Sequence, residues 1–207
     1  MKTLFNTLVL FIISLSSLAQ IQPHTFAVSS SFSFNRNNFE STNVAAPGDY
    51  TTKFLRIEPK LGFFISKRFS VGGTFSYVWS NTYGSLIGGR DITNKSIGRG
   101  VFVKYYQPIV KNFYAIAGLD FSWTKQWNEY TSFDPFSGST VTFEEEVTNT
   151  ILQRGLGLAY FINKNISIEL MGEYFTVVGG DKTTFYTPES RLLFSLGFQI
   201  YLFERSE

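Results

Sequence analysis

The chain has 207 residues, the length of one domain, and 18 Lys and Arg against 16 Asp and Glu give it a net charge of +2. This balance argues against a nucleic-acid partner, which would need a basic excess, and an aromatic content of 18% excludes a disordered chain. With no Cys and one His, the sequence excludes disulfides, thiolate sites and multi-histidine metal sites, and we predict no metal and no cofactor.

The N-terminal segment has the pattern of a secretory signal peptide. Lys2 precedes an apolar run over residues 4–18, and small residues occupy the −3 and −1 positions before Gln20. The run is shorter than the ~20 residues of a membrane-spanning helix, and no later apolar run reaches that length. We therefore predict a signal peptide over residues 1–19 and a single domain over residues 20–207.

The remaining chain alternates large apolar residues with small or polar ones, which is typical of β-strands whose two faces meet different surroundings. Near the C-terminus, for example, Leu196, Phe198 and Ile200 alternate with a Gly and a Gln. Eight segments have this period of two, and no window has a convincing helical period. In chain order they cover residues 26–34, 55–65, 69–79, 101–105, 113–123, 156–160, 166–174 and 192–202.

Short and long connections between these segments alternate along the chain. We expect short turns at residues 66–68, 108–112 and 163–165, and long loops near residues 36–52, 80–97, 126–149 and 178–190. This alternation predicts an antiparallel meander with both termini on the short-turn side, which is the pattern of outer-membrane barrels. Pro59 lies inside the second segment and cannot donate a ladder hydrogen bond, so we expect a local bulge there or an early end to regular pairing.

The bulky apolar face must point outward, because the interior of an eight-stranded barrel is just wide enough for side chains to fill. The other face is rich in Gly, Ala, Ser and Thr, which fit inside. Aromatic residues gather at both ends of the segments, as in interfacial girdles: Tyr77, Trp79, Trp123 and Tyr174 toward the long loops, and Phe69, Tyr105, Phe113 and Tyr160 toward the short turns. The sequence therefore predicts an all-β fold, an eight-stranded antiparallel up-and-down transmembrane β-barrel.

On this strand pattern, length, turn alternation and apolar last segment, the chain resembles the small eight-stranded outer-membrane β-barrels, such as the transmembrane domain of outer membrane protein A and its short relatives. The resemblance covers the whole chain after the signal peptide. It implies residence in the outer membrane of a Gram-negative-type bacterium, contact with lipid and lipopolysaccharide, insertion by the barrel-assembly machinery and a monomeric state. It does not imply one activity, since members include anchors, adhesins, narrow pores and lipid-modifying enzymes.

The inward parity collects eight charged residues, four of each sign. Buried charges need partners, so a balanced set in a narrow lumen predicts a network of ion pairs and hydrogen bonds. We expect this network to close the core, and the alternative is a gate whose partners exchange to open a thin water path. The residues are Arg56, Glu58, Lys60, Lys104, Asp120, Glu169, Glu173 and Arg191.

The sequence offers no catalytic constellation. His24 is the one His, and it lies at the start of the first segment with no Ser and acidic residue converging on it. The carboxylate pair Glu169 and Glu173 is better explained by Arg and Lys partners than by catalysis. We therefore predict that the protein is not an enzyme.

Three cations have the outward parity near the loop ends of consecutive segments. Arg99, Lys125 and Arg154 are expected to form one basic patch beside Trp123. Two interpretations stay open: snorkelling of long side chains at the membrane interface, and contact with lipopolysaccharide phosphates through charge-assisted hydrogen bonds.

The predicted loops carry acidic and aromatic side chains. The third and longest contains Asp134 and the run Glu144, Glu145 and Glu146, for which we favour a solvated acidic loop over a calcium site. Exposed aromatic residues on loops are typical of recognition surfaces, so we expect an extracellular or envelope protein as partner. The loop aromatics are Tyr50, Tyr83, Tyr130, Phe133, Phe136, Phe185 and Tyr186.

Three functions remain open from the sequence. The first is a non-enzymatic outer-membrane barrel with a closed polar core and loops that serve envelope-structural or interaction roles. The second is a low-conductance channel for small solutes. The third is a soluble periplasmic binding barrel of lipocalin type, which requires the opposite arrangement of polar and apolar faces.

Overall fold

The computed structural model describes residues 21–41, 48–84, 91–134, 137–180 and 190–202. Within these ranges, the side chains of residues 37–41, 48–50, 84, 91, 132–134, 190 and 191 lie outside the description. The predicted signal peptide, residues 1–19, lies outside the described residues.

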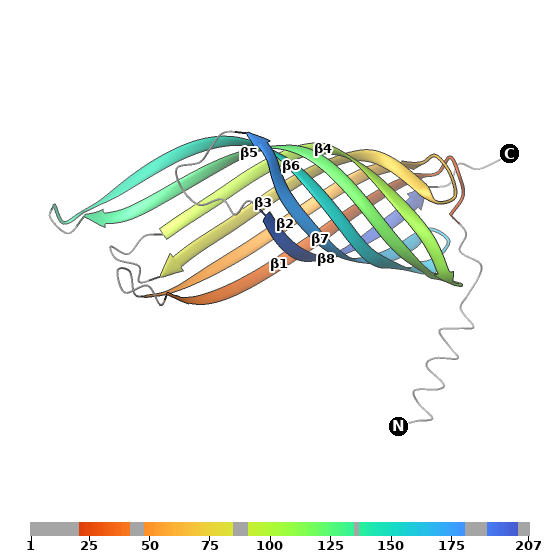
Figure 1. Cartoon of the computed structure of the whole chain (residues 1–207), viewed down its shortest axis with the longest axis horizontal. Helices are drawn as coiled ribbons and strands as arrows, with labels where there is room; N and C mark the ends of the chain where they lie inside the picture. The colour runs from red at the N-terminus through yellow and green to blue at the C-terminus, as the bar shows by residue number, and fades with distance from the viewer. Residues whose placement is uncertain (1–20, 42–47, 85–90, 135–136, 181–189, 203–207) are drawn as a thin grey trace, which may run out of the picture.

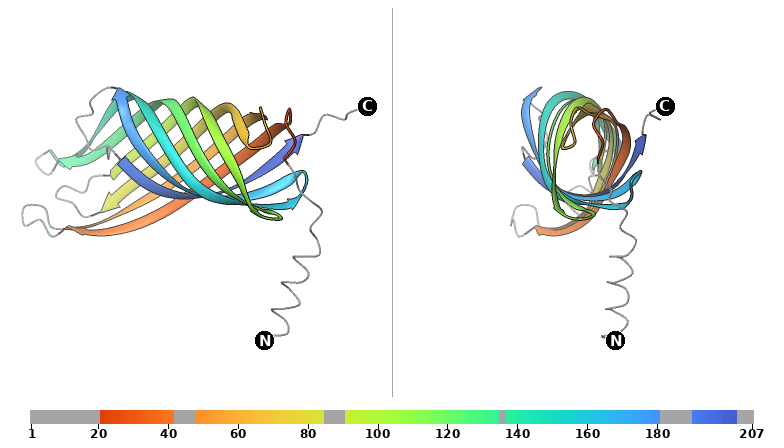
Figure 2. Two further views of the ribbon diagram at one scale, coloured as in Figure 1. Left: turned by 45° about the vertical axis from the view of Figure 1, so that its right-hand side comes forward. Right: turned by 90° about the vertical axis from the view of Figure 1, so that its right-hand side faces the viewer.

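Eight antiparallel strands form a closed up-and-down barrel in which each strand pairs with its neighbours in sequence and β1 pairs with β8 (Figure 1). The predicted fold class is confirmed, and Figure 2 shows the closed ring of strands end-on. The strands are β1 (Phe26–Ser41), β2 (Gly48–Phe64), β3 (Phe69–Gly84), β4 (Asp91–Val110), β5 (Phe113–Asp134), β6 (Ser139–Asn163), β7 (Ile166–Gly180) and β8 (Ser190–Leu202).

The two faces of the barrel have the inverted arrangement of a transmembrane barrel. The outward apolar side chains are exposed, Leu156 to 72% and Phe194 to 70%, whereas the described inward charged side chains are buried. At the short-turn end, the outward rings of Phe69 and Tyr105 pair across β3 and β4 at 4.9 Å between centroids. A soluble barrel of lipocalin type would place its apolar face inside, so this arrangement argues against that alternative.

The strands are longer than the sequence pattern predicts. Much of residues 36–52, 80–97 and 126–149, expected as long loops, is strand, and β5 and β6 pair as far as Asp134 opposite Ser139. These upper parts lack the bulky apolar outward face of the barrel because they lie beyond the lipid, yet their backbone hydrogen-bond ladder continues. The predicted loops were therefore wrong in extent.

Pairing around Pro59 shows neither the predicted bulge nor an early end, but a short interruption on one side of β2. The residue pairs with Ser30 in β1, but the β2–β3 ladder stops at Ile57 opposite Tyr77 and resumes at Lys60 opposite Thr74 in the same register. The missing N–H of proline removes a ladder bond, as expected, and costs no shift of register.

Among the described residues, the ladders that join β7 to β6 and β8 to β1 stop before the others, so the remaining strands continue beyond them as a sheet. β7 ends at Gly180 opposite Asn149, and the β1–β8 ladder ends at Phe32 opposite Leu196. Residues 126–134 of β5 and 139–148 of β6, called here the β5–β6 extension, project farthest from the barrel (Figure 1).

Candidate functional site

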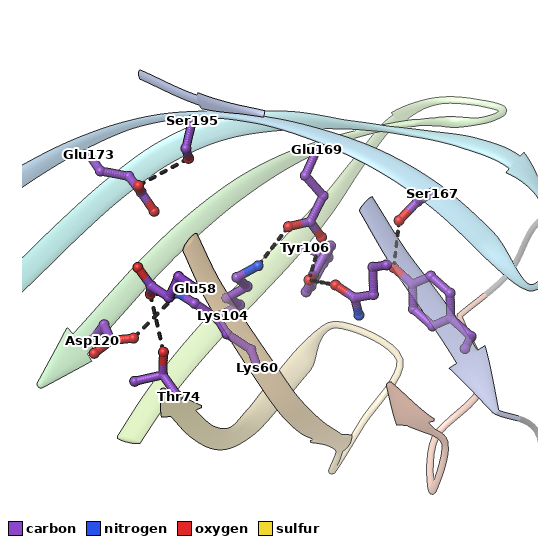
Figure 3. Close-up of polar contacts among 12 residues, drawn as sticks. Glu58, Lys60, Thr74, Lys104, Tyr106, Asp120, Ser167, Glu169, Glu173 and Ser195 are labelled. Atoms are coloured by element: carbon purple, nitrogen blue, oxygen red, sulfur yellow. Dashed lines mark hydrogen bonds and ion pairs between the residues drawn. The ribbon is translucent and has the colours of Figure 1, made fainter. Parts of the chain in front are cut away.

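The first charged cluster in the interior centres on Lys60, which lies between two carboxylates (Figure 3). Its Nζ is 2.7 Å from Oε1 of Glu58 and 3.3 Å from Oδ2 of Asp120. Arg56 also pairs with Glu58, and Thr74 Oγ1 donates to Glu58 Oε1 at 3.2 Å. Alternation along β2 aims residues 56, 58 and 60 into the lumen, so three charges from one strand form a row with two ion pairs.

Amide and hydroxyl groups extend this cluster across the lumen. Arg56 Nη2 donates to Gln153 Oε1 at 2.8 Å, and Gln153 Nε2 donates to Glu173 Oε1 at 2.6 Å. Ser195 Oγ donates to Glu173 Oε2 at 3.0 Å. The chain of hydrogen bonds therefore links β2 across the lumen to β6, and from there to β7 and β8.

The second charged cluster lies nearer the short-turn end. Lys104 Nζ is 2.6 Å from Glu169 Oε2, and the hydroxyl of Tyr106 donates to Glu169 Oε1 at 3.0 Å. Gln199 Oε1 lies 3.1 Å from the same hydroxyl. Since β4 and β7 are not neighbours in the barrel, the Lys104–Glu169 ion pair crosses the lumen and ties the two walls together.

Phe102 fills the space between the two clusters. Lys60 Nζ lies 5.4 Å and Lys104 Nζ 6.0 Å from its ring centroid, within the range of cation–π attraction. The ring fits because Gly62 and Gly72 on neighbouring strands have no side chain. A Cβ at Gly72 would lie 2.8 Å from Cε1 of Phe102, closer than such contacts allow.

An aromatic layer fills the lumen at the short-turn end. Tyr106, Phe64, Tyr201, Phe161 and Tyr114 come from five strands, and successive rings in this order have centroids 5.3, 5.6, 5.1 and 4.9 Å apart. Sequence reasoning missed this layer, although each residue has the inward parity of its strand. The signal was available in the last inward positions before the short turns.

The segment before β1 packs beneath this layer. Ile21 is 3% exposed and belongs to the same buried apolar cluster. Backbone hydrogen bonds attach the segment to β2, with His24 N donating to Phe64 O at 2.7 Å and Phe64 N donating to Thr25 O at 2.9 Å. The short-turn end of the lumen is thus filled by side chains from the strands and from the N-terminal segment.

Two small cavities lie among the charged residues of the interior. Each has a volume of ≈ 10 Å³, and one lies beside Ser31 and Ser195, the other beside Asp120, Gln153 and Glu173. Each volume is about that of one water molecule, so each cavity has room for a single water beside the charged side chains.

Seven of the eight interior charges predicted from the sequence are described, and all seven are buried. The side chain of the eighth, Arg191, lies outside the described residues. The sequence did not single out Gln153, Thr74, Tyr106 or Ser195 as members of the network. Their inward parity could have indicated them, but parity does not give the partners that they contact, because several of these contacts cross the lumen between strands that are not neighbours.

The three outward cations are exposed on β4, β5 and β6 but differ in their surroundings. Arg99 lies opposite Trp123 in the β4–β5 ladder. Lys125 pairs with Glu146 at 2.7 Å, and Arg154 lies opposite Leu119 rather than Trp123. The structure therefore brings Arg99 beside Trp123, neutralises Lys125 and separates Arg154 along the barrel wall.

The acidic run predicted in the third loop lies on a strand of the extension. Tyr130 Oη donates to Glu145 Oε2 at 3.3 Å, and burial together with this carboxylate raises the pKa of Tyr130 to about 12. Of the other loop aromatics, the Tyr83 ring lies 5.1 Å from Lys53 Nζ. The side chains of Tyr50, Phe133 and Asp134, and all of Phe136, Phe185 and Tyr186, lie outside the described residues.

The described residues contain no group of three His, Asp or Glu side chains that could hold a metal ion. His24 is exposed, and its ring contacts Phe63 at 6.0 Å between centroids. In the described part of the chain, no helix has the length and apolarity needed to cross a membrane, a finding that does not bear on strands.

Comparison with known proteins identifies the fold. No protein-family profile matches the sequence, and no curated protein matches it. Among solved structures, the outer membrane protein OprG from Pseudomonas aeruginosa is 9% identical with a TM-score of 0.50, covering 90% of this chain and 99% of its own. The Ail protein of Yersinia pestis is 13% identical with a TM-score of 0.47, and the match covers 87% of this chain and 99% of Ail. Neisserial surface protein A is 14% identical with a TM-score of 0.46, and the match covers 84% of this chain and 96% of that protein. The chain therefore has the fold of the small eight-stranded outer-membrane β-barrels.

Proposed function

We propose that the protein is an integral outer-membrane β-barrel without enzymatic activity, in which the polar core stays closed. The strand ends and loops beyond the membrane serve as an envelope-structural or interaction surface. The proposal includes residence in the outer membrane of a Gram-negative-type bacterium, export through the signal peptide, insertion by the barrel-assembly machinery and a monomeric state.

The observation that carries the proposal is the filling of the lumen. The chain of bonds from Asp120 through Lys60 to Glu173 crosses the interior, the Lys104–Glu169 pair crosses it a second time, and the aromatic layer fills the end below. Opening a path would separate buried charges from their partners, and breaking such a pair costs about 3–5 kcal/mol.

Conductance of the refolded protein in a planar bilayer tests the closed core. We expect no discrete current steps at neutral pH. The alternative function, a low-conductance channel for small solutes, predicts discrete openings whose size changes in Lys104→Gln or Glu173→Gln, and that result would overturn the proposal. Lys67→Gln, at an exposed short turn, is the matched control.

Contact with lipopolysaccharide is the second part of the proposed surface. Arg99 is exposed beside Trp123 and Arg154 is exposed on the neighbouring wall, and both guanidinium groups suit phosphate oxygens. We expect Arg99→Gln with Arg154→Gln to reduce the lipopolysaccharide retained by the purified barrel more than Lys125→Gln, because Glu146 already pairs with Lys125. Unchanged retention in the double variant would leave only snorkelling to explain these positions.

A further inference from the structure

Among the described residues, the β6 strand has an unpaired edge in the β5–β6 extension. Residues 139–147 pair with β5, and the ladder to β7 begins only at Asn149, opposite Gly180. Within the described residues, no strand pairs with this edge, and residues 139–144 are all exposed. An open edge presents backbone N–H and C=O groups to which another extended chain can add as a strand.

One face of the extension is acidic. Glu129 on β5 lies directly opposite Glu144 on β6, and Glu146 lies two residues farther along β6. Like charges in opposed positions destabilise a sheet, and the described residues place no cation within 4 Å of Glu129 or Glu144. The nearest basic side chain with an ion pair, Lys125, binds Glu146. A partner with positive charge would offset the repulsion.

The opposite face of the same edge is apolar toward the tip of the extension. Phe143 is 61% and Val141 38% exposed, and both alternate with Thr142 and Glu144 along β6. The next residue of this parity, Glu145, is half-buried and accepts a hydrogen bond from Tyr130. Directly opposed residues of neighbouring strands have Cβ atoms about 4.5–5.5 Å apart, so a strand added at residues 141–144 would place apolar side chains beside one parity and charged side chains beside the other.

We propose that the edge of β6 in the extension binds, by strand addition, an extended segment of a partner protein in which Lys or Arg alternates with apolar residues. The basic positions lie beside Glu144 and Glu146, and the apolar positions lie beside Phe143 and Val141. The inference rests on the proposed function of this end of the barrel as an interaction surface, and it names the class of partner.

Synthetic peptides test the inference on the full protein refolded in phosphatidylcholine vesicles, which are neutral and do not attract the peptide by charge. The probe is a labelled heptapeptide of alternating Lys and Val, and the control has the same composition with four Lys followed by three Val. We expect the alternating peptide to bind about tenfold more tightly in fluorescence anisotropy, because only it matches both faces. Equal binding of the two peptides would overturn the inference.

N-methylated peptides separate strand addition from simple charge attraction. Methylation of alternate backbone nitrogens removes the donors on one edge of the peptide strand, and the complementary pattern removes those on the other. We expect one pattern to abolish binding and the other to retain it. Binding of peptides with both methylation patterns would contradict strand addition. Self-association of the protein in place of peptide binding would contradict a basic peptide as the occupant of the edge.

Variants place the site on the molecule. Glu144→Gln with Glu146→Gln should weaken binding of the alternating peptide about three- to tenfold, whereas Lys67→Gln, at an exposed short turn on the opposite end of the barrel, should leave it unchanged. Equal effects of the acidic pair and Lys67 would contradict the site. Failure of peptide binding in a barrel that is silent in bilayer recordings overturns this inference alone, whereas discrete conductance contradicts the proposed function.

Discussion

Strands β5 and β6 run through two regions with opposite surroundings, and the same period of two has a different meaning in each. In the barrel, Leu119 and Leu156 point outward and are exposed, whereas Asp120 and Gln153 point inward and are buried. In the extension, the outward parity is acidic and exposed, and the other parity carries exposed Phe143 and Val141. Alternation therefore reports that two faces differ, and the surroundings decide which face carries the charges.

The two regions also differ in what an ion pair contributes. The Lys60–Glu58 pair is buried, where removal of one partner leaves an uncompensated charge in a low dielectric. The Lys125–Glu146 pair has side chains 49% and 53% exposed, where such pairs contribute little. Substitutions in the barrel should therefore change stability far more than equivalent substitutions in the extension.

The largest effect is expected for Lys60→Met. The substitution leaves Asp120 without its cation and Glu58 with Arg56 alone, so the free energy of unfolding should fall by about 3–5 kcal/mol. The urea midpoint of the protein in vesicles measures it. Lys67→Met, at an exposed short turn, should leave the midpoint unchanged, and equal midpoints for the two variants would contradict a buried network.

A charge on the lipid face should have the next largest effect. Leu156→Arg, at a position 72% exposed on the barrel wall, should lower the free energy of unfolding by about 2–4 kcal/mol because the cation would face hydrocarbon. Phe143→Arg, in the extension, is 61% exposed and should be nearly neutral, since water surrounds it. A barrel that tolerates both equally would not have its apolar face in lipid.

A smaller loss is expected for Tyr106→Phe. The change removes a buried hydroxyl that donates to Glu169, and leaving a buried acceptor short of a donor costs about 1–3 kcal/mol. Tyr105→Phe is the matched control, because its hydroxyl donates to Gln107 at the exposed surface. Urea unfolding compares the stability of the two variants. If Tyr105→Phe lowers the free energy of unfolding as much as Tyr106→Phe, the buried hydrogen bond contributes no more than an exposed one.

The smallest effect has the opposite sign. Glu129→Lys replaces a like-charged pair with an opposite-charged one across from Glu144, so the extension should be stabilised by about 0.2–1 kcal/mol. Amide hydrogen exchange of residues 139–147 measures this local stability. Thr131→Lys, opposite Thr142, should not slow exchange, and a slowing as large as that of Glu129→Lys would contradict the repulsion.

The sequence predicted the parts of the fold that meet lipid. A bilayer imposes apolar alternation on every spanning segment, so eight strands and seven of the buried charges follow from parity. The extension was not predictable in this way, because beyond the lipid the outward parity is no longer bulky and apolar, while the backbone ladder persists. Pairs such as Lys104 with Glu169 were also beyond the pattern, since they join strands that are not neighbours and depend on the stagger of the closed barrel.

Reactivity of single introduced thiols tests the central claim, and the absence of Cys from the sequence gives each variant one label site. Ser122→Cys faces the closed interior and Leu156→Cys faces the lipid. In vesicles, we expect the first to resist a small water-soluble cationic thiol reagent, and the second to react only with a lipid-soluble maleimide. Rapid reaction of Ser122→Cys with the water-soluble reagent would reveal a water-filled lumen, and the same reaction at Leu156→Cys would show that the barrel wall faces water.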